Sequence, residues 1–152
     1  MSNNFHILLL NGPNLNMLGI RERSLYGNIT YDELILKMQK IAKELNIKLT
    51  DFQSNSENQL IDKIHYAYKK NVNYMLINIA AFTHTSIAIR DAILSVSIPF
   101  YEIHLSNIFS RDKFRHKSYL SDIAQGVIIG FGIDGYIFAL NHAIKYLKYT
   151  QY

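Results

Sequence analysis

The stretch FHILLLNGPN, residues 5–14, sets the fold class. A short apolar run is closed here by Asn11-Gly12-Pro13, and this pattern is typical of a buried strand that ends in a turn. Beyond it, short apolar runs alternate with segments in which apolar residues recur at helical spacing. Alternation of this kind predicts a parallel β-sheet with helices on both faces.

The whole chain predicts five strands and four helices in the order β-α-β-α-β-α-β-loop-β-α. A capping box of Thr30 and Glu33 begins the helix that runs to about Leu45. The other predicted elements are strands over Phe5–Leu10, Lys48–Gln53, Tyr74–Ile79, Pro99–Ile103 and Val127–Ile129, and helices over Asn58–Lys70, Ser86–Val96 and Tyr136–Leu147. This order favours one domain, residues 1–152, with a flavodoxin-like, doubly wound, five-stranded parallel sheet.

Length and composition narrow the class of protein further. The 152 residues fit one domain of about 100–200 residues, and 49% hydrophobic with 18% charged residues is typical of a globular protein. The lack of cysteine excludes disulfides, iron–sulfur clusters, thiolate zinc sites and a cysteine nucleophile. The sequence shows neither a signal peptide nor an apolar run of about 18 residues. We therefore expect a cytoplasmic protein with no membrane partner.

The net charge of +4 allows three interpretations: a nucleic-acid partner, a solvated surface, or a few arginines that hold a small anionic substrate. The lysines are scattered, which favours a solvated surface. The arginines form two local pairs, Arg21 with Arg23 and Arg111 with Arg115. We therefore expect a small-molecule substrate and no nucleic acid.

Polar residues follow three of the predicted strands. The long segment 11–29 follows the first, residues 80–86 follow the third, and Glu102, His104 and Ser106 lie at the end of the fourth. Because the carboxyl ends of parallel strands meet at one edge of the sheet, these side chains should converge there. A connection as long as 11–29 is typical of a functional loop.

The converging residues can perform acid–base chemistry. His104 can donate a proton near neutral pH, since the reference pKa of histidine is about 6.5. Glu102 leaves the same face of the strand and could orient the imidazole, or the two could form a structural ion pair. His84 is predicted to open a helix, where free backbone N–H groups suit an anion or a simple cap. Judged by its residue type and its place on a loop, Tyr26 is interpreted as a packing residue.

Residues 130–135, GFGIDG, match the G-x-G-x-x-G pattern of dinucleotide-binding loops. That fingerprint also needs a further strand with an acidic residue about 20 residues on, and the chain has no such strand. We interpret these glycines as a turn with close helix–strand packing, while a nucleotide-binding module stays the alternative. The sequence carries no HExxH or His-x-His pattern, so no metal is expected.

Several longer motifs occur in order along nearly the whole chain: LNGPNLNMLG (10–19), Arg21-Glu22, Tyr26-Gly27, QSN (53–55), THTS (83–86), Arg90-Asp91-Ala92, EIHLSN (102–107) and FRHKS (114–118). Together they resemble the type II 3-dehydroquinate dehydratases. The resemblance implies a flavodoxin-like subunit that assembles as trimers into a homododecamer. It also implies the reversible dehydration of 3-dehydroquinate to 3-dehydroshikimate through an enolate, in the shikimate pathway or in quinate catabolism, without cofactor or metal.

The resemblance also implies residue roles. Tyr26 would be the base, His104 the acid oriented by Glu102, and Asn14 the holder of a water or the enolate oxygen. The substrate-binding positions would be Asn78, His84, Asp91, Leu105, Ser106 and Arg115, with Asp91 reaching a neighbouring subunit's site.

A tyrosine that acts as a phenolate base needs a lowered pKa, because only about 0.1% of a free tyrosine is ionised at pH 7. The positive charge of Arg21, on the same loop as Tyr26, could lower that pKa. A cation at about 4 Å from the phenolate stabilises it by at most about 4 kcal/mol at an effective dielectric of 20. A decrease of two units in the pKa of the tyrosine requires about 2.7 kcal/mol.

Three positions depart from the family's usual pattern. Arg23 replaces a proline, so we expect a looser loop with a second cation near the base. Ala80 replaces a glycine, and its methyl group should narrow the site or shift the backbone. Lys113 replaces an acidic residue and should make the segment over the site more basic.

Overall fold

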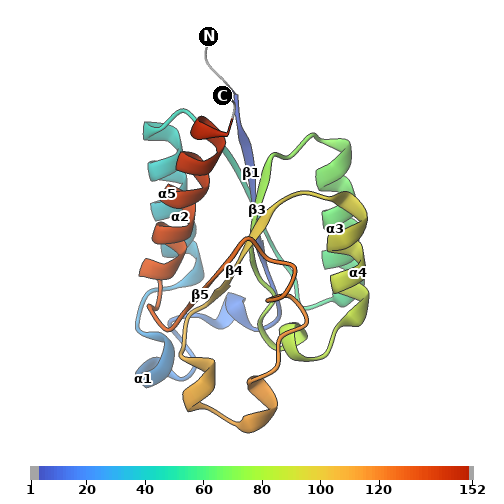
Figure 1. Cartoon of the computed structure of the whole chain (residues 1–152). Coiled ribbons are helices and arrows are strands. Elements are labelled where there is room, and N and C mark those ends of the chain that lie inside the picture. The colour runs from blue at the N-terminus through green and yellow to red at the C-terminus, as the bar shows by residue number, and fades with distance from the viewer. Residues whose placement is uncertain (1–3, 151–152) are drawn as a thin grey trace.

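The computed structural model describes residues 4–150 and contains one five-stranded parallel sheet (Figure 1). The strands are β1 (His6–Asn11), β2 (Lys48–Gln53), β3 (Tyr74–Asn78), β4 (Phe100–His104) and β5 (Gly126–Ile129). Their order across the sheet is β2-β1-β3-β4-β5. This is the flavodoxin-like order, and the predicted fold class is confirmed.

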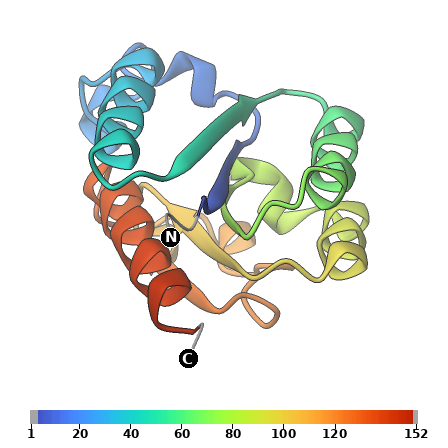
Figure 2. The same ribbon diagram turned by 90° about the horizontal axis from the view of Figure 1, so that it is seen from above.

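Helices cover both faces of the sheet (Figures 1 and 2). They are α1 (Arg23–Tyr26), α2 (Tyr31–Glu44), α3 (Glu57–Lys69), α4 (Ile87–Val96) and α5 (Asp134–Tyr149). Helices α2 and α5 pack on one face, and α3 and α4 pack on the other. Alternate residues of β1 therefore enter different cores: Ile7 and Leu9 face α2 and α5, whereas Leu8 and Leu10 face α3 and α4. Burial of each such side chain contributes about 1.5–3 kcal/mol.

The starts of α2 and α4 follow from capping residues. Thr30 Oγ1 accepts from the Glu33 backbone N–H at 3.2 Å, and the Glu33 carboxylate accepts from the Thr30 N–H at 3.4 Å, so the predicted capping box is confirmed. Ser86 Oγ accepts from the Ile89 N–H at 2.9 Å and caps α4. The sequence had suggested that His84 opens a helix, but this prediction is wrong. His84 ends the 3₁₀ turn η2 (Ala80–His84) instead.

The segment 11–29 is more ordered than the predicted loop. It contains the 3₁₀ turn η1 (Leu15–Met17) and the single helical turn α1. Helix α1 begins after Glu22, whose φ of 40° lies in the left-handed region, and the Tyr26 N–H donates to the Glu22 carbonyl. A four-residue helix is too short to show a helical period, so the sequence pattern does not reveal it.

The turn at residues 130–135 supports the end of β4. Gly130 and Gly132 have φ of 89° and 59°, and their N–H groups donate to the carbonyls of His104 and Leu105. A Cβ on Gly135 would lie 3.0 Å from the Ile128 side chain, so α5 packs closely on β5. The interpretation as a turn with close helix–strand packing is confirmed. None of the helices in residues 4–150 has the length and apolar character needed to cross a membrane.

Candidate active site

A cavity of about 110 Å³ lies at the carboxyl ends of β1, β3 and β4. Nine of the eleven residues predicted for the site line it: Asn14, Arg21, Tyr26, Asn78, His84, His104, Leu105, Ser106 and Arg115. Of the other two, Glu102 contacts His104 from outside the lining, and Asp91 lies exposed on α4. The parallel topology thus brings these segments together as expected.

The turn after β1 is fixed by close backbone approach and by residues at the end of β2 and just beyond it. The Gly12 N–H donates to the Asn78 carbonyl at 2.8 Å, and a Cβ on Gly12 would lie 2.3 Å from the Ile79 carbonyl oxygen, so only glycine fits. Asn14 has φ of 68°, and its N–H donates to Asn55 Oδ1 at 3.0 Å. Gln53 donates to that same oxygen at 3.2 Å. Residues 53–55 therefore hold Asn14 at the cavity.

A buried network holds Asn78. Its Nδ2 donates to the Tyr136 hydroxyl at 2.8 Å, and that hydroxyl donates to Asn11 Oδ1 at 2.6 Å. Burial raises the pKa of Tyr136 far above its ordinary value, so the phenol stays neutral. Tyr136, which sequence reasoning did not single out, thus orients Asn78 from α5.

His104 and Glu102 form a buried pair. His104 Nε2 lies 2.5 Å from Glu102 Oε2, and the two side chains are 5% and 1% exposed. Burial opposes ionisation of Glu102, but hydrogen bonds from His104, Ser121 and Ser118 outweigh it, and the pKa of this carboxyl lies below its ordinary value. An anionic carboxylate here supports a positive charge on His104.

His84 faces the same cavity. Its Nδ1 lies 2.7 Å from the Lys117 carbonyl and therefore carries a hydrogen in that contact, and its ring lies near-parallel to that of His104 with centroids 6.2 Å apart. Burial lowers the pKa of His84, and the positive charges of His104 and Arg115 lower it further. A neutral imidazole can bind substrate hydroxyls as donor or acceptor.

Tyr26 contacts two arginines. Arg111 Nη1 donates to the Tyr26 hydroxyl at 2.6 Å, and the Arg21 guanidinium lies 5.2 Å from the centre of the phenol ring. Arg111 also lines the cavity. Sequence reasoning noted the pair Arg111 and Arg115 but gave Arg111 no role, although the spacing of this pair was the available signal.

The three residues that depart from the family pattern differ in their position relative to the cavity. Arg23 is absent from the cavity lining, and its Nε donates to the Gly19 carbonyl at 3.0 Å. The cation that donates to the Tyr26 hydroxyl is Arg111, so a second cation near the base from Arg23 stays a prediction. Ala80 does line the cavity, and its φ of 52° shows why glycine suits this position. Lys113 is exposed and outside the lining.

Metal binding has no visible basis in the part of the chain that the structure describes. Across residues 4–150, no group of three or more His, Asp or Glu side chains is placed to hold a metal ion. The groups that meet in the cavity are a phenol, two imidazoles, amides and guanidinium groups. These groups can move protons and bind carboxylates and hydroxyls.

The fold and the cavity define an α/β enzyme with acid–base side chains at the carboxyl edge of a parallel sheet. Residues 5–144 match the model of the family Dehydroquinase class II. The chain belongs to this family, as the motifs had indicated.

Relatives of known function and a solved structure support the same family assignment. The chain is 62% identical over 148 residues to 3-dehydroquinate dehydratase of Proteus mirabilis (strain HI4320), covering 97% of this chain and 100% of that one. It is 60% identical over 151 residues to the protein of that name from Enterobacter sp. (strain 638), covering 99% and 100%. The crystal structure of type II dehydroquinase from Butyrivibrio crossotus DSM 2876 matches with a TM-score of 0.90 and 45% identity, covering 91% and 97%.

Proposed function

We propose that the chain catalyses the reversible dehydration of 3-dehydroquinate to 3-dehydroshikimate. The convergence of Tyr26 with Arg111 and of His104 with Glu102 on one cavity carries this proposal. The substrate is a β-hydroxy ketone with a carboxylate. Loss of water from it requires a base beside the ketone, stabilisation of an enolate, and an acid at the departing hydroxyl.

Tyr26 acts as the base in this proposal. Its phenolate takes the proton from the carbon beside the ketone, and the electron pair of that C–H bond forms the enolate. The Arg111 guanidinium stabilises the phenolate through a charge-assisted hydrogen bond, and Arg21 adds a second positive charge at the ring. Asn14, exposed at the end of the turn after β1, holds a water or the enolate oxygen.

His104 acts as the acid. As the enolate collapses, the C–O bond breaks and the imidazolium of His104 gives its proton to the departing hydroxyl, which leaves as water. The buried carboxylate of Glu102 supports that positive charge and fixes the ring. Proton transfer by a positioned side chain is worth about 10²–10⁴-fold in rate.

The remaining residues of the lining hold the substrate. Arg115 and Arg111 provide positive charge for the carboxylate, and Asn78, His84 and Ser106 provide partners for hydroxyl groups. Leu105 is 4% exposed and takes part through its backbone. The mechanism uses no cofactor and no metal.

The assembly, compartment and pathway belong to the same proposal. Asp91 lies exposed on α4 and outside the lining of its own cavity. This position suits a residue that reaches the site of a neighbouring subunit in a trimer, and four trimers would form the homododecamer. The enzyme would act in the cytoplasm, in the shikimate pathway or in quinate catabolism.

The test is the ultraviolet absorbance of the conjugated enone that forms when 3-dehydroquinate is added. The wild-type chain should produce it, and Tyr26→Phe should lower kcat by about 10³-fold or more while the circular dichroism spectrum stays unchanged. Tyr149→Phe, an exposed tyrosine on α5, is the control. Absence of the enone with well-folded wild-type protein would overturn the proposed reaction, and near-normal turnover by Tyr26→Phe would overturn the proposed base.

A further inference from the structure

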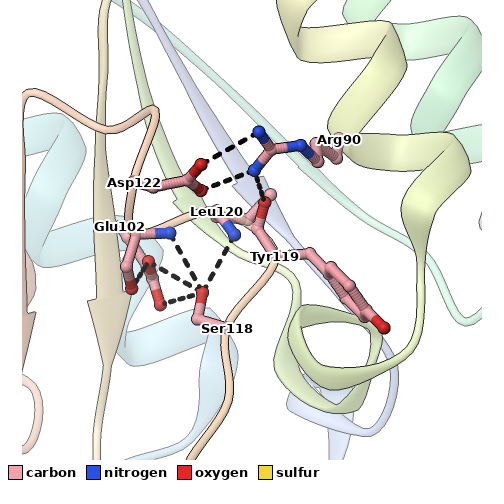
Figure 3. Close-up of polar contacts among 7 residues, drawn as sticks. Arg90, Glu102, Ser118, Tyr119, Leu120 and Asp122 are labelled. Carbon is pink, nitrogen blue, oxygen red and sulfur yellow. Dashed lines mark hydrogen bonds and ion pairs between the residues drawn. The ribbon is translucent and has the colours of Figure 1, made fainter.

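Residues 117–122, which we name the strap, run between α4, η2 and the end of β4 (Figure 3). The Tyr119 N–H donates to the Thr83 carbonyl at 2.9 Å, which ties the strap to η2. Leu120 is fully buried in the core beneath α3 and α4. The strap is therefore anchored by backbone and by apolar burial.

Arg90 of α4 binds the strap through side-chain hydrogen bonds. Its guanidinium donates to Asp122 through both terminal nitrogens, at 2.5 and 2.9 Å, and to the Tyr119 carbonyl at 2.8 Å (Figure 3). A bidentate guanidinium–carboxylate pair restricts geometry in two directions. Because this pair is exposed, its main effect is on where the strap lies rather than on stability.

The strap places two hydroxyl groups on the buried carboxylate of Glu102. Ser118 Oγ lies 3.1 and 3.0 Å from the two carboxylate oxygens, and Ser121 Oγ donates to Oε1 at 2.6 Å. Ser118 Oγ also accepts from the Leu120 N–H (Figure 3) and from the Ser121 N–H, so its own hydrogen is directed to Glu102. A carboxylate that is 1% exposed needs such donors to remain ionised.

The strap also contacts the second histidine of the site. The Lys117 carbonyl accepts from His84 Nδ1 at 2.7 Å. One short segment thus fixes His84 directly and fixes His104 through Glu102. The near-parallel arrangement of the two rings is consistent with this shared support.

We propose that Ser118 and Ser121 are positioning residues of this enzyme: from the strap, they hold Glu102 as an anion directed at His104 Nε2. The inference rests on the acid role proposed above for His104. Neither serine lines the cavity, so neither is expected to contact substrate.

Other charged groups must be considered in any test that varies the pH. The titratable and charged side chains that share the cavity with His104 are Arg21, Tyr26, His84, Arg111 and Arg115. The strap itself presents only hydroxyl groups to Glu102. Variants of the strap serines leave all these charges in place, so a change in the titration of Glu102 can be assigned to the lost donor.

The experiment uses the full chain with Ser121→Ala, Ser121→Thr and, as a control, Ser95→Ala, whose hydroxyl donates to the backbone carbonyl of Asp91 on α4. Loss of one hydrogen bond to a charged group should lower kcat of Ser121→Ala about tenfold and change KM less than about twofold, since the lost bond does not contact substrate. Carbon-13 NMR should show the pKa of the Glu102 carboxyl rising. Ser121→Thr should restore kcat and that pKa, because it keeps the hydroxyl at an exposed position.

His104→Gln separates the two proposals. If His104→Gln keeps wild-type kcat, the acid role of His104 fails. If His104→Gln is impaired while Ser121→Ala matches Ser95→Ala in kcat and in the Glu102 titration, the positioning role of the strap is overturned and the acid role stands. A Ser121→Ala protein that loses only thermal stability would likewise overturn the positioning role.

Discussion

Arg111 donates a 2.6 Å hydrogen bond to the Tyr26 hydroxyl, although 85 residues separate them. The bond joins α1, near the start of the chain, to the segment after β4. It also gives the proposed base a positively charged partner at its reacting oxygen. Arg21, by contrast, lies over the Tyr26 ring and pairs with Glu22 at 3.0 Å.

The first prediction follows from this bond. Arg111→Ala should lower kcat about 100-fold, because a charge-assisted hydrogen bond contributes about 1.5–3 kcal/mol. Arg111→Lys should recover part of the loss through its charge. The enone assay measures both variants, and Lys113→Ala, an exposed residue of the same segment that lies outside the cavity lining, is the control. Turnover within threefold of wild type in Arg111→Ala would mean that this bond has no catalytic role.

The second prediction concerns Ala80. With φ of 52°, its Cβ is strained by about 1–2 kcal/mol, whereas glycine at an ordinary position costs about 0.5–1 kcal/mol in conformational entropy. Ala80→Gly should therefore raise the free energy of unfolding by about 0.5–1 kcal/mol, as measured in urea. The matched change Ala88→Gly, on the exposed face of α4, should lower it by about 1 kcal/mol. Equal losses in both variants would contradict the assigned strain.

Much of the fold could be predicted from the sequence because the local spacing of apolar residues distinguishes strands from helices. The five strands are short apolar or alternating runs, and the four longer helices repeat their apolar residues at 3.6 residues. Helix α1 was missed because one turn carries no period. His84 was wrongly expected to open a helix: Ser86 supplies the cap of α4, and His84 is the last residue of η2.

The site was predictable where topology alone brings residues together. Asn78 and His104 end two parallel strands and His84 follows one of them, so they meet whatever the details of packing. Arg111 and Ser121 reach the site because their segments fold back over the sheet, and no local pattern encodes that path. The family resemblance named residues of the motifs, but the partners that orient those residues emerge only from the three-dimensional contacts.

The third prediction concerns acid and His84. Burial and nearby positive charge keep the pKa of His84 below 6.5 in the folded state. The unfolded chain therefore binds the proton first, and stability falls as the pH drops from about 6.5 towards the folded pKa. The loss is about 1.4 kcal/mol for each unit by which the two pKa values differ.

His84→Asn isolates this effect, because asparagine keeps a donor for the Lys117 carbonyl but does not titrate. The pKa of His6 is also lowered by burial and by Lys48 and Lys63, so the useful quantity is the difference between wild type and variant. Urea unfolding at pH 7.0 and 5.5 should show a larger loss for the wild type. Parallel losses would show that His84 titrates alike in both states.

The fourth prediction concerns Tyr136, whose hydroxyl joins Asn11 and Asn78. Tyr136→Phe removes one oxygen atom but leaves two buried amide groups without this partner, and each unpaired buried group costs about 1–3 kcal/mol. The free energy of unfolding should fall by about 2–4 kcal/mol, and KM should rise because Asn78 loses its orientation at the cavity. Tyr149→Phe on the same helix, where the side chain is 68% exposed, should change neither quantity. If Tyr136→Phe lost stability while KM stayed at the wild-type value, the network would support the core without setting the position of Asn78.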